Sequence, residues 1–215
     1  MSSARENIMK RIRRANEHCS DISSEEMLAQ RTSQHTQGPK PQWTEELMTR
    51  FVMKAEQSAA SVAKVETEQA IVEAVEAYLE EQSLGNQLLC ANTPLINSLK
   101  WPEKMSVAAR TATTDDKVVL VEAFSAIAET GSIVMCSSEA TPVSLNFLPD
   151  YFVCVVRRKS IVNHIEDVWQ KIREQGAGMP RAVNIITGPS RTADVEQIIQ
   201  MGAHGPRKVH LLLLD

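Results

Sequence analysis

Aromatic residues are scarce in this sequence, at 4% of its 215 residues, and basic residues are not in excess, since the formal net charge is -4. Base-stacking platforms need aromatic rings, and binding to a phosphate backbone needs a positive field. Both deficits argue against nucleic acid as a partner. The basic cluster between Lys10 and Arg14 is flanked by Glu6 and Glu17 and shares its segment with an apolar stripe, which favours the solvated face of a helix.

A long apolar run, an apolar leader and paired cysteines are also missing. No stretch approaches the roughly 18 apolar residues of a membrane span, and Arg5 and Glu6 interrupt the place where a signal peptide needs an apolar core. We therefore expect a cytoplasmic protein with no membrane span. The cysteines lie far apart without a C-x-x-C pair, at Cys19, Cys90, Cys136 and Cys154. Isolated thiols in apolar runs are typical of core residues in a reducing compartment.

Standard cofactor and metal motifs are absent as well. The sequence contains no Walker A, H-E-x-x-H or G-x-S-x-G motif, and Gly176-Ala177-Gly178-Met179 lacks the third glycine of a dinucleotide fingerprint. The histidines show no ligand spacing with carboxylates or thiols; they are His18, His35, His164, His204 and His210. We expect no bound metal and no redox cofactor.

Composition divides the chain near residue 42. Residues 1–42 are predicted to form an N-terminal helix followed by a polar linker over residues 20–42, where no apolar periodicity occurs. Residues 43–215 are predicted to form the main α/β domain. Within it, helical spacing covers residues 43–58 and 67–82, with Thr67 as the N-cap of the second helix.

Short apolar runs then alternate with helical patterns. Strands are predicted over residues 88–91, 105–109, 117–121, 132–136, 151–156, 182–187 and 209–214, and helical turns over residues 93–99, 122–129, 160–173 and 192–201. Runs such as VNIIT and VHLLLL are apolar at both alternations, as strands covered on both faces must be. This order predicts an open, largely parallel α/β sheet.

The segment from Ile185 to Asp194 combines a strand end, a Gly-Pro turn and a predicted helix start. Ser190 or Thr192 would be the N-cap, so the backbone amides would point into the crevice where α/β proteins bind ligands. This pattern predicts that a small anion binds at Gly188, Pro189, Ser190 and Arg191. The alternative is a turn and helix cap with no ligand.

Two further turns carry reactive side chains. Glu129, Thr130 and Gly131 come directly before a buried strand, so Glu129 could act as a base or nucleophile beside backbone that glycine leaves open, or it could be a solvated last-turn residue. The turn over residues 202–208 carries His204, which could be a general acid or an anion ligand, or part of a helix C-cap. Glu129 and His204 are the candidate catalytic residues, and Thr130 and Gly131 join the candidate anion-binding set.

Three segments together resemble a known family. They are AIAETGSIVM over residues 126–135, VSLNFLPDYFVCVVRRKSIV over 143–162 and ITGPSRTADVEQIIQMGAHGPRKVHLLLLD over 186–215. The sequence resembles the lactate-utilisation protein C family, whose members carry the LUD domain. The resemblance implies a three-layer α/β/α fold similar to the NagB/RpiA/CoA-transferase group, with the N-terminal helix as an extension.

The resemblance also implies a function and partners. It points to a role in oxidation of L-lactate to pyruvate alongside iron-sulfur partner proteins, whose cysteine motifs this chain lacks. It supplies no established catalytic residue. An alternative of another class is a small-molecule enzyme of CoA-transferase-like or sugar-phosphate-isomerase-like type, since Glu129-Thr130-Gly131 loosely resembles the E-x-G element in which a carboxylate is the nucleophile.

Overall fold

The computed structural model describes residues 4–17, 24–34, 37–176, 178–192, 200–202 and 204–215. The chain divides into two compact units, residues 1–41 and 42–215. The first unit contains the expected helix α1 (Ala4–Glu17) and a second helix, α2 (Ser24–Gln34), inside the segment predicted to be a linker. The linker prediction is therefore wrong for these residues. Glu25 and Glu26 in the first turn of α2 and Arg31 in its last turn complement the helix dipole, which favours a helix without an apolar stripe.

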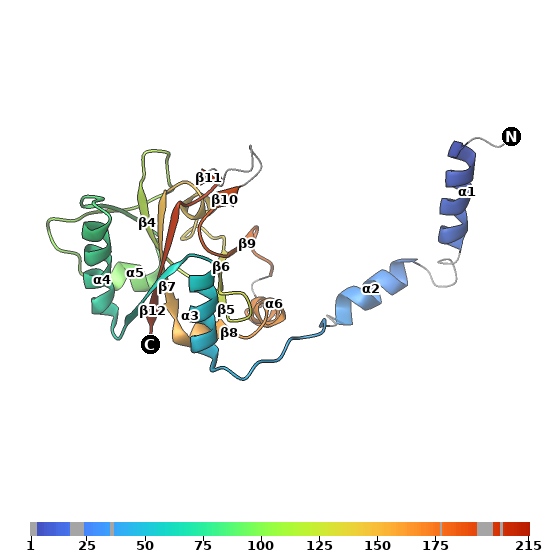
Figure 1. Ribbon diagram of the computed structural model, residues 1–215, viewed down its shortest axis with the longest axis horizontal. Helices are drawn as coiled ribbons and strands as arrows, with labels where there is room; N and C mark the ends of the chain where they lie inside the picture. The colour runs from blue at the N-terminus through green and yellow to red at the C-terminus, as the bar shows by residue number, and fades with distance from the viewer. Residues whose placement is uncertain (1–3, 18–23, 35–36, 177, 193–199, 203) are drawn as a thin grey trace. The chain divides into compact units, whose positions relative to one another are not determined.

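A six-stranded sheet forms the centre of the second unit (Figure 1). Every pairing in it is parallel, as predicted. Its strands, in spatial order, are β1 (Ser61–Val65), β12 (Lys208–Leu214), β7 (Tyr151–Arg157), β4 (Val118–Glu122), β2 (Gln87–Cys90) and β3 (Ser106–Ala109). The central strands are apolar at both alternations because protein covers both faces of the sheet.

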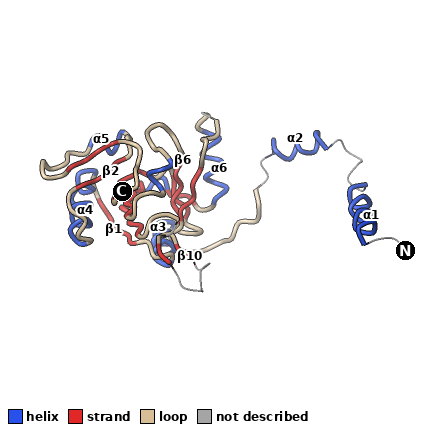
Figure 2. The backbone as a smooth tube through the Cα atoms, turned by 90° about the horizontal axis from the view of Figure 1, so that it is seen from above, coloured by secondary structure: helices blue, strands red, loops and turns tan. Residues whose placement is uncertain are grey.

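Not all helices of the second unit pack against this sheet. Helices α4 (Glu68–Glu81) and α5 (Pro94–Ser98) contact it and lie on the same side of it (Figures 1 and 2), whereas α6 (Ile165–Glu174) contacts strands that do not belong to this sheet. Helix α3 (Leu47–Gln57) contacts β1 and also a second, smaller sheet. Thr67 caps α4 as predicted, since its hydroxyl accepts a hydrogen bond from the Ala70 amide at 3.2 Å. None of the helices in the described part of the chain is long and apolar enough to cross a membrane.

The second sheet is mixed and has four strands. Its order is β8 (Ile161–Val162), β5 (Ser125–Ile127), β6 (Ser132–Cys136) and β9 (Val183–Ile186). Strand β5 pairs antiparallel with β6 and parallel with β8. Strand β9 lies at an edge and Ile185 is 39% exposed, so the expectation that this strand is covered on both faces is wrong.

Three helix predictions need correction. The segment 122–129 holds β5, because pairing with two neighbouring strands and complete burial outweigh its helical spacing. The helix predicted from residue 160 begins at Ile165, because Ile161 and Val162 extend the small sheet. The helix predicted over 192–201 is wrong at both ends, where β10 (Arg191–Thr192) pairs antiparallel with β11 (Gln200–Met201). Residues 193–199 lie outside the described part of the chain.

Candidate functional site

Two of the predicted turns meet at the C-terminal half of α3. Gly131 has φ +70°, and a Cβ atom at this position would lie 2.2 Å from the backbone nitrogen of Ala55. Gly188 has φ +68°, and a Cβ atom there would lie 1.9 Å from the carbonyl oxygen of Ser58. Both positions require glycine, for conformation and for space. The structure therefore brings the turn after β5 and the turn after β9 against the same short stretch of helix.

A chain of three hydroxyl groups joins these turns. The hydroxyl oxygens of Thr130 and Ser132 lie 2.6 Å apart, and that of Ser132 lies 2.6 Å from the hydroxyl oxygen of Thr187. Each hydroxyl can both donate and accept, so the chain can reverse its direction by rotation of the hydroxyl hydrogens, with every oxygen in place. Thr130 was predicted to belong to the site, whereas Ser132 and Thr187 were not. Ser132 begins β6 and Thr187 directly follows β9, so their proximity becomes apparent only once the antiparallel pairing of these strands is known.

Glu129 pairs with a histidine that the sequence analysis did not select. A carboxylate oxygen of Glu129 lies 3.0 Å from Nδ1 of His164. The imidazole is buried and packs against the ring of Trp43, with 4.7 Å between centroids. The Glu129 side chain is 29% exposed. A fixed imidazole that holds a partly exposed carboxylate is an arrangement suited to proton transfer or nucleophilic attack.

Local pairing explains how Glu129 and His164 come together. Strands β5 and β8 are parallel neighbours, and the Glu129 amide donates to the carbonyl oxygen of Asn163 at 3.0 Å. The next residue, His164, is the N-cap of α6, and its amide donates to a carboxylate oxygen of Asp167 at 2.9 Å. The sequence signal that could have identified His164 was this position at a helix start, immediately after a short apolar strand.

The turn over residues 188–191 differs from the predicted anion site. The Ser190 amide donates to the carbonyl oxygen of Pro206 at 2.8 Å, so this amide is already occupied. Arg191 is exposed, and Arg191 and Thr192 belong to β10 instead of a helix start. The helix dipole that was expected to favour an anion therefore does not begin at these residues. Anion binding by Gly188, Pro189, Ser190 and Arg191 stays a prediction.

His204 is exposed, and within the described residues it makes no hydrogen bond with Glu129. The carboxylate has His164 as its imidazole partner instead. The two candidate catalytic residues are therefore not joined into one hydrogen-bonded pair. A catalytic role for His204 stays a prediction.

A cavity of about 550 Å³ lies at the carboxyl end of β4, where ligands bind in many parallel α/β sheets. Its lining includes Thr93, Glu122, Phe124 and Cys136, none of which the sequence analysis placed in a site. Burial raises the pKa of the Cys136 thiol, and Glu122 accepts a hydrogen bond from Arg157 at 2.7 Å. These side chains are already committed to packing or pairing, so the cavity offers shape more than reactive groups.

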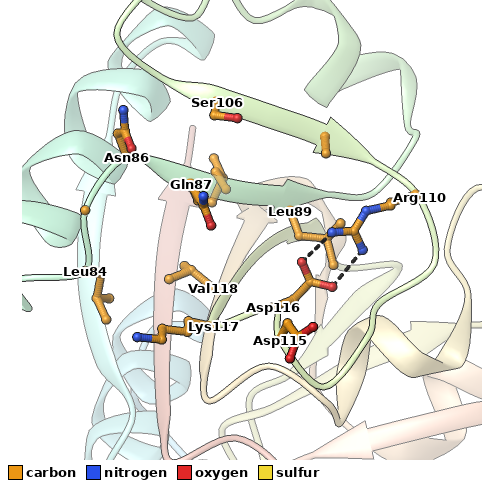
Figure 3. Close-up of a pocket in the computed structure, with 13 residues that line it drawn as sticks. Leu84, Asn86, Gln87, Leu89, Ser106, Arg110, Asp115, Asp116, Lys117 and Val118 are labelled. Carbon is orange, nitrogen blue, oxygen red and sulfur yellow. Dashed lines mark hydrogen bonds and ion pairs between the residues drawn. The ribbon is translucent and has the colours of Figure 1, made fainter.

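A second cavity, of about 390 Å³, opens where β2 and β4 diverge (Figure 3). The two strands pair only through Leu89 and Cys90 of β2, which leaves a gap beside the preceding residues. Arg110 closes one side by donating two hydrogen bonds to the carboxylate of Asp116, both at 2.7 Å. This contact lowers the pKa of Asp116 to about 2. Arg110 and Asp116 therefore neutralise each other's charge and hold each other in place at this side of the cavity.

Comparison with known proteins gives a family match over the second unit. The family described as the LUD domain matches residues 48–214. The protein YkgG of Escherichia coli is 31% identical over 166 residues, which cover 75% of this chain and 70% of YkgG. Lactate utilization protein C of Bacillus subtilis is 35% identical over 92 residues, 41% of this chain and 38% of the relative. The protein of the same name from Geobacillus thermodenitrificans is 36% identical over 91 residues, again 38% of that relative.

A solved structure shares the fold. The crystal structure of a DUF162 family protein from Deinococcus radiodurans superposes with a TM-score of 0.56, covering 81% of this chain and all of that one. The sequence identity is 21%, so this similarity concerns the fold alone.

Proposed function

The chain belongs to the LUD domain family, and on this premise we propose that it is a component of L-lactate utilisation that takes part in oxidation of L-lactate to pyruvate. The observation that carries the proposal is the family match over residues 48–214, together with relatives named lactate utilization protein C. We further propose that the chain acts with iron-sulfur proteins and holds no redox cofactor itself.

The described cysteines support a division of labour with such partners. Burial raises the pKa of Cys90 to about 12 and also raises that of Cys154. Clusters are bound by several thiolates that lie close together, and among the described residues no group of three or more His, Cys, Asp or Glu side chains could hold a metal ion. Cys136, the third described cysteine, is only partly buried, but the burial of its thiol also raises its pKa. These residues do not favour cluster binding, so we propose that electrons pass through clusters held by other proteins.

Growth and reconstitution test this role. A strain that lacks the gene for this chain is expected to lose growth on L-lactate, to keep growth on pyruvate, and to recover when the full-length chain is restored. The purified chain is expected to reduce no dye with L-lactate until the iron-sulfur proteins are added. Stoichiometric flavin or iron in the isolated chain, with lactate-dependent dye reduction, would show that the chain is the dehydrogenase. Normal growth of the deletion strain on L-lactate would remove the proposal.

A second candidate function rests on the 3.0 Å contact between Glu129 and His164. We propose as the alternative a small-molecule enzyme with a three-layer fold of the NagB/RpiA/CoA-transferase type. In acyl transfer, the Glu129 carboxylate would attack the thioester carbonyl and coenzyme A would leave as the thiolate, giving a mixed anhydride. In isomerisation of a sugar phosphate, the same carboxylate would remove a proton.

Glu129→Gln separates the two functions. If the alternative holds, this variant abolishes turnover of acetyl-coenzyme A or ribose phosphate and keeps its resistance to urea, because glutamine has the same shape and can still bond to the imidazole. His204→Gln tests the other candidate residue in the same assay. If neither compound is turned over by the wild-type chain, the alternative fails, whereas the lactate role is judged independently by growth.

A further inference from the structure

A cavity of about 360 Å³ lies beside the amino ends of β1 and β12, at the edge of the sheet opposite to the one where α/β proteins usually bind ligands. Its polar lining comprises Ser61, Tyr78, Gln82, Arg207, Lys208 and His210, together with the exposed carboxylate of Glu81. Pro189 adds part of the wall, so the turn over residues 188–191 borders this cavity. Elements distant in the sequence thus converge on one polar space.

Ser61 and His210 are paired across neighbouring strands. The Ser61 hydroxyl oxygen lies 2.7 Å from Nδ1 of His210 and 3.5 Å from the carbonyl oxygen of Val209. The hydroxyl and Nδ1 therefore share one hydrogen bond, and the tautomer of the ring decides which of the two atoms is the donor. Burial lowers the pKa of His210 and so favours the neutral ring, whose Nε2 donates or accepts according to the tautomer.

Tyr78 holds this imidazole in place and contributes an unsatisfied group. The two rings are stacked, with centroids 4.3 Å apart and an angle of 9° between their planes. Tyr78 is 5% exposed, and its hydroxyl is buried with no hydrogen-bond partner among the described residues. Burial raises its pKa to about 12, so the phenol keeps its proton at neutral pH. A buried hydroxyl without a partner is unfavourable, which makes an acceptor from a ligand an effective complement.

The remaining polar groups are mostly donors. Lys208 donates from Nζ to the Gln82 side-chain oxygen, which leaves the Gln82 amide nitrogen as the free end of that side chain. Arg207 donates from Nε to a carboxylate oxygen of Asp150 at 3.2 Å. This contact leaves the two terminal guanidinium nitrogens of Arg207 as further donors. Glu81 is the one carboxylate among the lining residues, and it is exposed to screening solvent. The cavity therefore presents a surplus of donors.

We propose that this cavity binds a small organic anion with several acceptor oxygens, a carboxylate or a phosphate monoester. Lys208 supplies the cation, the Tyr78 hydroxyl supplies a neutral donor, and the stacked rings of Tyr78 and His210 form a shared aromatic surface. The inference does not depend on the lactate role. It also differs from the predicted use of turn amides at residues 188–191, because side chains do the binding.

Isothermal titration calorimetry of the full chain tests the proposal with inorganic phosphate, glycerol phosphate and L-lactate, each at constant ionic strength with chloride as background. At least one probe is expected to bind saturably at one site per chain. Lys208→Gln is expected to weaken that binding about tenfold, as is typical for loss of a charged hydrogen-bond donor. Lys64→Gln is the matched control, because Lys64 is an exposed lysine of β1 that does not line the cavity.

Tyr78→Phe gives an independent readout, since it removes only the hydroxyl that has no partner. The variant is expected to keep the wild-type resistance to urea while it binds the probe about fivefold more weakly. Binding of the phosphate probes alone identifies a phosphoryl site, and binding of L-lactate alone identifies a carboxylate site. The proposal is overturned if none of the three probes binds, or if Lys208→Gln and Tyr78→Phe bind them like the wild-type chain.

Discussion

Substitution of Gly131 by alanine should destabilise the second unit strongly. A Cβ atom at this position would lie 2.2 Å from the nitrogen of Ala55 and 2.3 Å from the carbonyl carbon of Lys54, and both are backbone atoms of α3 that cannot rotate away. The left-handed φ of +70° adds a cost of about 1 to 2 kcal/mol for any residue with a Cβ. Overpacking adds about 1 to 3 kcal/mol. We expect Gly131→Ala to lower the free energy of unfolding by about 2 to 5 kcal/mol, the sum of these two contributions.

Gly85 provides a matched control, because its φ is +75° and a Cβ there would meet nothing within 4 Å. Gly85→Ala should therefore show the conformational cost alone, about 1 to 2 kcal/mol, and the reduced entropy of the unfolded chain affects both variants alike. Equilibrium unfolding in urea, followed by circular dichroism, gives the two values. Equal losses in the two variants would refute the packing of this turn against α3.

Thr67→Ala should lower the free energy of unfolding by about 1 kcal/mol because it removes the N-cap of α4, whereas Thr67→Ser should keep the cap and the stability. Unfolding in urea measures both variants. Arg110 lowers the pKa of Asp116, so this carboxylate stabilises the fold above about pH 4 and loses its effect as pH falls toward 2. Between about pH 4 and pH 2 the free energy of unfolding should fall by about 1 kcal/mol, a figure that allows for solvent screening. The Asp116→Asn variant should not show this fall. Iodoacetamide should modify half-buried Cys136 before buried Cys154 in the native chain. Mass spectrometry measures the two rates, and equal rates would contradict the prediction.

The parallel sheet was predictable because the sequence of each central strand indicates a strand without reference to its neighbours. Segments such as Tyr151–Arg157 and Lys208–Leu214 are apolar at both alternations, and such runs have few alternatives to a strand covered on both faces. Helix α4 was predictable for a similar reason, since apolar spacing and the cap at Thr67 indicate the same element. Where several local signals agree, the sequence determines the element without knowledge of its neighbours.

The small sheet was harder to predict because its strands are short and depend on each other. Ser125–Ile127 is only three residues long and carries helical spacing, so nothing local separates it from a helical turn. Its pairing with Ile161–Val162 decides the structure, and that partner lies more than thirty residues away in the chain. The same pairing places His164 beside Glu129, which explains why one half of this pair was predicted and the other half was missed.

The long segment over residues 186–215 shows why a motif that identifies a family need not mark a reactive site. Gly188 is required by the close approach of Ser58, and the Ser190 amide is required by the carbonyl oxygen of Pro206. These residues lock two turns to each other and to α3, so substitutions there would be read as loss of function even if no ligand ever touched them. His210, by contrast, lines a cavity. Variants of cavity-lining side chains that keep the turns intact therefore distinguish chemistry from folding within this motif.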